Sequence, residues 1–295
     1  MENLENWKIA GSIAAKALQY GKGLIKPGVK LLDVAESIEA YIYNEGANPA
    51  FPVNLSLNNI AAHYSPMIND SSVFNKKDVV KLDVGVVYQG CLGDTALTVD
   101  LSGKHDKLVQ SVEAALAAAI AMIKPGVSTN LIGETIEKTI TRMGFKPIKN
   151  LGGHQMKENN LHCGTFIPNY NDKSKIKLEK GQIIAIEPFA APRSSYIYEK
   201  GDPYIIMLKS PHLLYEYGIS DEFIQAIEPF KHLPLSLRWI SKRLPLEKWL
   251  PAVKELSDKK AFISYEPLCA EKNDVIVQAE HTIIVDDPSI ILTLA

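Results

Sequence analysis

Three apolar, strand-like segments of this chain each contain a single carboxylate: Asp83 in KLDVGVV, Glu187 in IIAIEPF and Glu280 in VIVQAEHTIIV. Strand interiors are poor in Asp and Glu, because a carboxylate that faces a core is costly unless it is hydrogen-bonded or paired with a cation. Two further candidate ligands, Asp94 and His154, lie in the segments GDTA and GGHQM. Together the five residues predict a buried site that needs positive charge nearby.

The segment 79–101 predicts an antiparallel hairpin that brings two of these carboxylates together, because two extended runs flank a Tyr-Gln-Gly turn. If the turn is centred on its first two residues, Asp83 lies directly opposite Asp94. If it is centred on the last two, Asp94 faces Gly85 and is a diagonal neighbour of Asp83. Both registers place the two carboxylates on one face, where like charges require a counter-ion. The competing interpretation is a solvated aspartate on the outer face of an ordinary hairpin.

Four carboxylates and one imidazole are mostly hard oxygen donors. This set suits Mn, Fe, Co or catalytic Zn and disfavours a sulfur-rich structural zinc site. Two divalent cations would neutralise the four negative charges, whereas a single cation would leave strong repulsion in a pocket of low dielectric constant. Two metals can activate water and polarise a carbonyl, so the ligand set predicts a two-metal hydrolase.

The elements that must position these residues are duplicated within the chain. Shifted by 98 residues, segment 25–49 aligns with segment 123–147 with 11 identities in 25 positions. Each copy follows an Ala-rich helical stretch and contains a Pro-Gly turn, apolar residues at helical spacing and a glycine where the second helix would end. We therefore expect an α+β fold in which two helix pairs, related by a pseudo-two-fold, pack on a sheet.

The composition is that of an ordinary globular protein. With 295 residues, 46% hydrophobic content and a net charge of -2, the chain can bury a core and has no strong field that would favour nucleic acid or anionic membranes. No segment approaches the roughly 18 apolar residues of a membrane span, and the acidic N-terminus is unlike a signal peptide. The odd set of three cysteines also suits a reducing compartment. We expect a cytoplasmic monomer with no membrane partner.

Two more histidines lie near the candidate ligands. His63 is in FPVNLSLNNIAAHYS, and His162 follows His154 in GGHQMKENNLHCG. Taken singly, each is more typical of a hydrogen-bonded structural histidine than of a catalytic one. The adjacent Cys163 does not indicate a thiol protease, because neighbours in an extended chain point in opposite directions. Only the conjunction of these residues with the carboxylates favours a functional site.

In these motifs the chain resembles the methionine aminopeptidases of the type II, archaeal-like form, which have the pita-bread fold with an internal pseudo-two-fold repeat. The resemblance extends over essentially the whole length. The matching segments are NPAFPVNLSLNNIAAHY, LDVGV with GDTA, LGGHQM, LHCG, AIEPFA and QAEHTIIV. The resemblance implies two divalent metal ions, of Co, Mn, Fe or Zn, that would be held by Asp83, Asp94, His154, Glu187 and Glu280.

The resemblance also implies roles for individual residues. Glu187 would relay a proton, while His63 and His162 would hydrogen-bond the substrate and stabilise charge in the transition state. An apolar pocket that fits an unbranched thioether would be lined by Phe51, Leu161 and Phe189. Leu161 stands where much of the family has isoleucine. The implied activity is removal of the first methionine from nascent proteins with a small second residue, close to the ribosome.

Residues 209–264 have helical signals of their own. Ser220 precedes DEFIQAIEPF, LPLSLRWISKR follows, and LPLEKWLPAVKELSDKK would place one apolar stripe at Leu246, Leu250, Val253 and Leu256. We expect a helical, winged-helix-like subdomain inserted into a catalytic domain formed by 1–208 and 265–295. A basic cluster beside Trp239 and Trp249, to which we assign Arg238, would permit nucleic-acid contact. The nearly balanced charge instead favours a subdomain that walls the cleft, with no nucleic-acid partner.

Two other functions stay open at this point. An Xaa-Pro aminopeptidase or prolidase-like peptidase would share the fold and the metals, although the insertion and the segment around His63 argue against it. A non-catalytic pita-bread binding protein would be expected to lose ligand residues, whereas this chain has all five.

Overall fold

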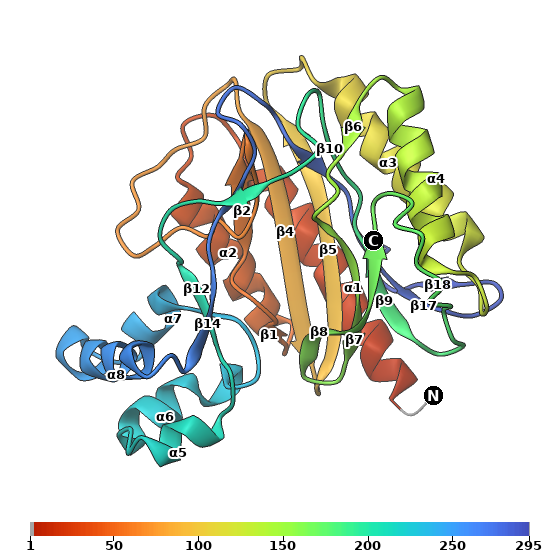
Figure 1. The fold of residues 1–295 in the computed structure, drawn as a ribbon. Coiled ribbons are helices and arrows are strands. Elements are labelled where there is room, and N and C mark those ends of the chain that lie inside the picture. The colour runs from red at the N-terminus through yellow and green to blue at the C-terminus, as the bar shows by residue number, and fades with distance from the viewer. Residues whose placement is uncertain (1–2, 295) are drawn as a thin grey trace.

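The computed structural model describes residues 3–294, and its four longest helices form two pairs that pack on the strands (Figure 1). The first pair is α1 (Leu4–Leu24) and α2 (Leu31–Asn44), and the second is α3 (Asp106–Met122) and α4 (Thr129–Arg142). The 98-residue offset relates α2 to α4, and it also relates the short strands β1 (Asn48–Pro49) and β6 (Lys146–Pro147). The duplicated architecture expected from the sequence is therefore confirmed.

The glycines at the ends of the two second helices explain why both copies end at the same point. Gly46 and Gly144 have φ values of 78° and 91°. This left-handed conformation is the usual helix C-terminal cap and favours glycine. Each helix is therefore stopped where the following strand begins.

The strands form one larger sheet in each half, and smaller sheets, one of which (β11-β15-β3, formed by Tyr198–Glu199, Leu268–Cys269 and Ile60–Ala62) joins the two halves. The N-terminal sheet has the order β1-β4-β2, with β5 paired to β4; the new strands are β2 (Asn54–Leu57), β4 (Val79–Tyr88) and β5 (Cys91–Asp100). The C-terminal sheet has the order β18-β17-β9-β7-β8, formed by β7 (Gly152–Lys157), β8 (Asn160–Pro168), β9 (Ile183–Ile186), β17 (His281–Ile284) and β18 (Ile290–Ile291).

Two three-stranded sheets complete the body of the protein. One has the order β16-β10-β6 and the other β11-β15-β3, with β3 (Ile60–Ala62), β10 (Phe189–Ala191), β11 (Tyr198–Glu199), β15 (Leu268–Cys269) and β16 (Val277–Gln278). Strands from distant parts of the chain therefore lie side by side, which brings the candidate ligands within reach of one another.

Each half buries its own core between its helix pair and its strands. In the first half Leu18 and Ile38 pack with Leu82 of β4, and in the second Ile136 packs with Ile184 of β9. Burial of such side chains is the main stabilising term for the two layers. The helices thus hold the strands, and the polar residues of the strands are directed to the opposite side.

The segment between β10 and β16 contains a separate group of helices (Figure 1, cyan to blue). It consists of β12 (Ile205–Leu208), α5 (His212–Glu216), α6 (Asp221–Ile227), the 3-10 helix η1 (Glu228–Phe230), β13 (Leu235–Ser236), α7 (Leu237–Ser241), α8 (Leu246–Asp258) and β14 (Phe262–Tyr265). Strands β12, β13 and β14 form a small sheet. The group has a hydrophobic cluster of its own. We refer to it below as the insertion.

The helix signals within the insertion are partly confirmed. Ser220 caps α6, with its Oγ accepting a hydrogen bond from the Phe223 N–H at 3.4 Å. The apolar stripe expected on α8 is half right: Val253 and Leu256 pack in the hydrophobic cluster, whereas Leu246 and Leu250 are 57% and 47% exposed. The buried residues of α8 are Trp249, Ala252 and Leu256. These residues also follow helical spacing, and the indole offers the larger apolar area to bury. The division of the chain at 209 and 264 stays a prediction.

Within residues 3–294, none of the helices combines the length and the apolar character that crossing a bilayer requires.

Candidate metal centre

The β4–β5 hairpin fixes the positions of Asp83 and Asp94. Its turn lies at Gln89 and Gly90, both with positive φ (49° and 83°), as in the two-residue turns that suit the twist of a hairpin. Asp94 therefore pairs with Gly85, and Asp83 pairs with Ala96. This is the second of the two expected registers, with the two carboxylates as diagonal neighbours.

The two glutamates lie at junctions between short strands rather than inside them, which differs from the expectation. Glu187 follows β9, where Pro188 has no N–H to continue a strand ladder. Glu280 lies between β16 and β17, and its backbone N–H donates to the Ala96 carbonyl of β5 at 2.9 Å. The chain leaves the regular ladder at both points, and both carboxylates line the same cavity.

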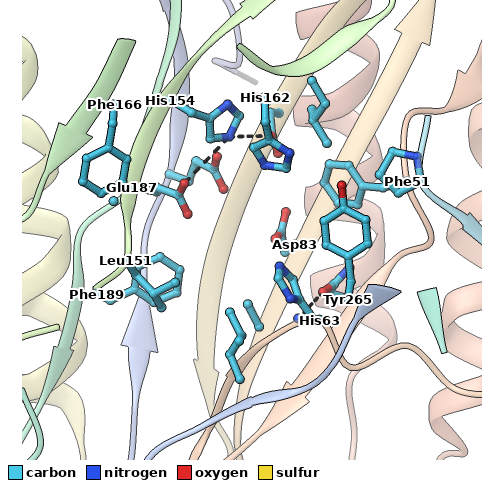
Figure 2. A pocket seen from close by; sticks show the side chains of 18 of the residues that line it. Phe51, His63, Asp83, Leu151, His154, His162, Phe166, Glu187, Phe189 and Tyr265 are labelled. Carbon is cyan, nitrogen blue, oxygen red and sulfur yellow. Dashed lines mark hydrogen bonds and ion pairs between the residues drawn. The ribbon is translucent and has the colours of Figure 1, made fainter. Parts of the chain in front are cut away.

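The histidines come from the paired strands β7 and β8. The register of this pair shifts on both sides of Gln155, so that bulges follow His154. Such bulges redirect side chains. The rings of His154 and His162 lie with their centroids 4.3 Å apart (Figure 2). Gly153 allows β7 to approach β9, because a Cβ there would lie 2.1 Å from the Ala185 carbonyl oxygen.

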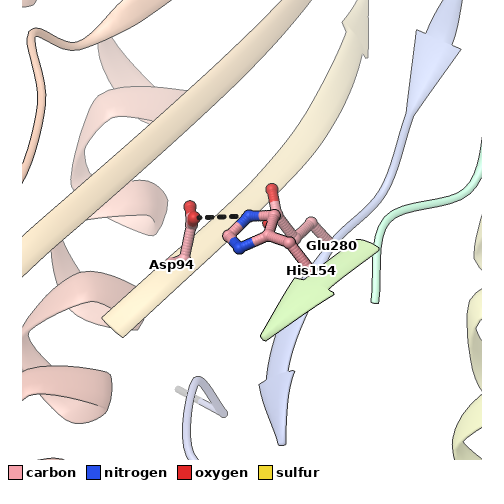
Figure 3. A group of neighbouring side chains, drawn as sticks. All are labelled: Asp94, His154 and Glu280. Carbon is pink, nitrogen blue, oxygen red and sulfur yellow. Dashed lines mark ion pairs between the residues drawn. The ribbon is translucent and has the colours of Figure 1, made fainter. Parts of the chain in front are cut away.

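All of the sequence-predicted site residues converge. The His154 Nε2 lies 3.6 Å from the Asp94 Oδ2 and 3.7 Å from the Glu187 Oε1. Asp94, His154 and Glu280 each offer one ligand atom, and these atoms lie within 4.8 Å of one another (Figure 3). A cavity of about 430 Å³ is lined by these residues and by Asp83, Glu187, His63, His162, Phe51, Leu161 and Phe189. The role of each residue stays a prediction.

The electrostatics of the cavity fit a divalent metal. Burial raises the pKa of Asp83, Glu187 and Glu280, and the charges of neighbouring carboxylates add to the effect. Burial also raises the pKa of Asp94 to about 7. The Oδ1 atoms of Asp83 and Asp94 are buried and have no hydrogen-bond partner among residues 3–294. A group of buried, partly unsatisfied carboxylates is costly unless a cation binds them.

The protein itself does not supply that cation from the wall of the cavity. The residues that line it, within the part of the chain that the structure describes, include no lysine and no arginine. Burial lowers the pKa of His154 to about 4, so its imidazole is neutral and can ligate a metal near neutral pH. Carboxylate oxygens with one imidazole nitrogen suit the harder divalent transition metals.

The apolar part of the cavity depends on a small residue in β4. A Cβ at Gly85 would lie 2.2 Å from the Phe51 Cε1, so only glycine at this position leaves room for the aromatic ring. Gly85 is also the residue that pairs with Asp94. The segment LDVGV thus provides both a carboxylate and the space for the apolar wall beside it.

His63 is held in an unusual conformation at the rim of the cavity. Its φ is 66°, in the left-handed region that few non-glycine residues adopt. Its backbone N–H donates to the Asn54 Oδ1 at 2.6 Å, and its Nδ1 donates to the Glu266 carbonyl at 3.3 Å. Burial lowers the pKa of His63 to about 4. The ring is therefore neutral, and because a carbonyl only accepts, the proton is on Nδ1 and Nε2 is a free acceptor.

Three residues that support the ligands were missed in the sequence. The Thr282 Oγ1 accepts a hydrogen bond from the Asp94 N–H and donates one to the Asp94 carbonyl, both at 2.8 Å. In return, the Thr95 Oγ1 donates to the Glu280 carbonyl at 2.8 Å. The Gln278 amide lies 3.3 Å from the Glu280 carboxylate and 3.5 Å from that of Glu187. A threonine of each half thus holds a candidate ligand of the other half.

The comparison with known proteins identifies the family. A family model described as metallopeptidase family M24 matches residues 5–287. The chain belongs to metallopeptidase family M24. Among its M24 relatives, the methionine aminopeptidase of Pyrococcus abyssi is 38% identical over 295 residues, which covers 96% of this chain and 97% of that protein. The resemblance stated from the sequence motifs is confirmed.

Solved structures of M24 proteins share the architecture. The crystal structure of a methionine aminopeptidase from Thermotoga maritima has a TM-score of 0.72 at 23% identity and covers 99% of this chain and 96% of that one. The prolidase from Pyrococcus furiosus has a TM-score of 0.62 at 17% identity, and the match covers 64% of that chain. At these identities the likeness concerns the fold, and the pita-bread fold is confirmed.

The raised carboxyl pKa values predict opposite pH trends for the metal-free and the metal-bound protein. Without metal and near neutral pH, the folded state binds more protons than the unfolded state, because burial raises the pKa of Asp94 from its ordinary value of 3.8 to about 7. Lowering the pH from 8 towards 7 should therefore stabilise the metal-free protein, whereas below the ordinary histidine pKa of 6.5 the buried His63, His154 and His162, whose pKa values are lowered, oppose this trend. Thermal unfolding after chelation, followed across this pH range, tests this trend.

Metal affinity should change in the opposite direction, because protons and metal compete for the same carboxylates. We expect weaker binding of Mn²⁺ or Co²⁺ as the pH falls below about 7, the pKa of Asp94. Binding should also release protons, which titration calorimetry in buffers of different ionisation enthalpy can count. An affinity that is constant between pH 8 and pH 6 would contradict the assignment of these carboxylates as ligands.

The threonine contacts predict a specific defect in metal binding. Thr282→Val removes both hydrogen bonds to the Asp94 backbone while keeping a similar shape, and Thr282→Ser keeps the hydroxyl. Loss of a residue that supports a metal ligand typically weakens affinity about 10- to 100-fold. We expect this loss for the valine variant and near-normal affinity for the serine variant in competition titrations. Equal affinities for the two variants would refute the supporting role of Thr282.

Proposed function

We propose that this chain removes the N-terminal methionine from peptides and proteins by metal-assisted hydrolysis of the first peptide bond. The single observation that carries the proposal is the meeting of five candidate ligands and an apolar pocket in one cavity. Its support is the membership in M24 and the 38% identity to methionine aminopeptidases over nearly the whole chain. The chain is then a metallo-exopeptidase.

The metal would be held by the carboxylates and the imidazole already described. Two divalent ions of Co, Mn, Fe or Zn match the four carboxylate charges, with Asp83, Asp94, His154, Glu187 and Glu280 as ligands. When bound, such ions supply Lewis-acid polarisation of a carbonyl and lower the pKa of water. The protein's own side chains would transfer the proton and hydrogen-bond the substrate.

Glu187 is proposed to accept the proton of the attacking water and to deliver it to the amine that leaves. Its carboxylate lies 3.7 Å from His154 and is buried, so proton transfer takes place away from bulk solvent. A carboxylate within reach of the reacting atoms is a suitable general base. The same residue therefore serves both as a ligand and as the proton carrier.

The two catalytic histidines act as neutral groups. Burial lowers the pKa of His162 to about 3, so it can donate an N–H to the carbonyl oxygen of the first residue without carrying charge. Donation to the oxygen that becomes negative stabilises the transition state more than the bound substrate. The His63 Nε2 is free to accept a hydrogen bond from the scissile amide N–H. The two rings would thus bind the carbonyl oxygen and the amide N–H of the same peptide bond.

The apolar wall accounts for the choice of the first side chain. Phe51 is 7%, Leu161 5% and Phe189 1% exposed, and all three line the cavity. A flexible, unbranched thioether fits such a lining and makes favourable contacts with aromatic rings. Methionine is therefore the favoured first residue, with a small second residue.

Partners and location follow from the same proposal. The substrates are nascent chains near the ribosome, and the enzyme acts as a cytoplasmic monomer without a nucleic-acid partner. The expected subdomain 209–264, which forms most of the insertion, serves to wall the cleft of the catalytic domain formed by 1–208 and 265–295.

A substrate panel tests the proposal directly. Metal-loaded protein should release methionine from Met-Ala-Ser and leave an Xaa-Pro dipeptide intact, and chelation should abolish the release until metal is restored. Cleavage of the proline substrate alone would favour a prolidase-like activity. Absence of any reaction with fully loaded protein would favour a binding function.

A second prediction concerns His162. His162→Ala should lower kcat by about 100- to 1,000-fold, because a donor to the developing oxyanion is lost. Its metal content should stay unchanged, because the ring is not among the five proposed ligands. Elemental analysis alongside steady-state kinetics checks both points, and loss of metal in this variant would contradict the proposed role.

A further inference from the structure

The loop of residues 63–66 carries His63 at the rim of the cavity, and the body of the protein holds only one side of it. From β2, Asn54 binds the backbone N–H of His63 at 2.6 Å, and the Leu55 N–H donates to the Tyr64 carbonyl at 2.8 Å. The left-handed backbone of His63 is strained and persists only where surrounding contacts enforce it. Contacts on the other side of the loop must therefore contribute.

Those contacts come from the insertion and the residues that directly follow it. The ring of Tyr265, the last residue of β14, meets the His63 ring edge to face, with centroids 5.3 Å apart (Figure 2). The next residue, Glu266, accepts the hydrogen bond from the His63 Nδ1. The end of the insertion thus sets the plane of the His63 ring, and the residue that follows it binds the protonated nitrogen.

Arg238 of α7 provides the third contact, and it is fully buried. Its Nε donates to the carbonyl of Pro66 at 3.0 Å. Its Nη1 and Nη2 donate to the two carboxylate oxygens of Glu39 in α2 at 2.6 and 2.7 Å. One guanidinium therefore joins the insertion, a helix of the N-terminal half and the His63 loop. From the sequence we assigned Arg238 to a basic cluster that could contact nucleic acid, but in the structure its side chain is buried.

The Arg238–Glu39 ion pair fixes the orientation of the guanidinium as well as joining the insertion to α2. A planar guanidinium that binds a carboxylate with two parallel hydrogen bonds has a fixed orientation, which aims the remaining Nε–H. Glu39 is further fixed by the Trp239 Nε1, which donates to it at 2.9 Å. Apolar side chains of the same size could hold the insertion equally firmly. They could not direct a donor at the Pro66 carbonyl.

We propose that Arg238 is a positioning residue through which the docked insertion sets the 63–66 loop, and with it the placement of the His63 imidazole. The insertion is then a working part of the active site and not only a wall of the cleft. The proposal rests on the proposed function for what His63 does to the substrate. The way in which the His63 ring is held depends only on the contacts in the structure.

The main test is a cycle of variants. Glu39→Leu combined with Arg238→Met removes the ion pair without leaving a lone buried charge, which avoids the largest destabilising effect. Each protein is compared with its counterpart in the His63→Ala background. The matched control is Lys242→Met, which breaks the exposed Lys242–Glu36 pair of 2.7 Å between the insertion and α2. No hydrogen bond or ion pair is found between Lys242 and the 63–66 loop within residues 3–294.

We expect the pair variant to lose about 10- to 100-fold in kcat/KM for Met-Ala-Ser, since small misplacements of a catalytic group have effects of this size. The loss should fall mainly on kcat, with metal content unchanged. The same substitutions should have little further effect in the His63→Ala background, and Lys242→Met should stay within about twofold of the parent. An equal loss in both backgrounds, or full activity in the folded pair variant, would overturn the proposal.

A spectroscopic measurement separates this proposal from the proposed function. Nitrogen-15 NMR of the imidazoles should show a single Nδ1–H tautomer for His63 in the parent and in Lys242→Met, and averaged nitrogen shifts in the pair variant. An unchanged His63 signal in the pair variant would refute the positioning role even if no peptide is cleaved. Should the pair variant fail to fold, Arg238→Lys takes its place, because lysine keeps the charge but cannot bind Glu39 twice and Pro66 at once.

Discussion

The fold depends on one electrostatic constraint: two aspartates of the β4–β5 hairpin and two glutamates at strand ends share one cavity, whose wall within the described residues has no lysine or arginine. Mutual repulsion in a medium of low dielectric constant would open such a site unless cations occupied it or protons neutralised it. The pKa values of the four carboxyl groups are raised, so without metal they tend to bind protons instead. Stability and metal binding are therefore linked properties of this protein.

The backbone around the site meets this constraint with short polar links. Thr282 and Thr95 each bind the main chain beside a ligand of the opposite half, and Gln278 lies between two carboxylates. The two threonine links join residues that are more than 180 positions apart in sequence. Two hydrophobic cores behind them provide the rigid support that precise placement of charged groups requires.

The sequence predicted much of this arrangement for identifiable reasons. A carboxylate in an apolar run is conspicuous, so Asp83, Glu187 and Glu280 could be found without a structure, and the internal repeat predicted both helix pairs. The threonine links could not be found, because their partners are distant in the chain and threonine is common in strands. Arg238 was misassigned for a related reason: nothing in the local sequence indicates that its partner is Glu39, in another helix.

The duplicated halves contribute unequally to the chemistry, although their scaffolds match. The first half provides the two aspartates, and the second provides the histidine and both glutamates, so neither half alone has a complete ligand set. If these residues are the ligands, as proposed, metal ions can bind to the full set only when the two halves are docked. On the proposed function, a chain in which the halves have not yet docked has no complete metal centre and would therefore be inactive towards peptides.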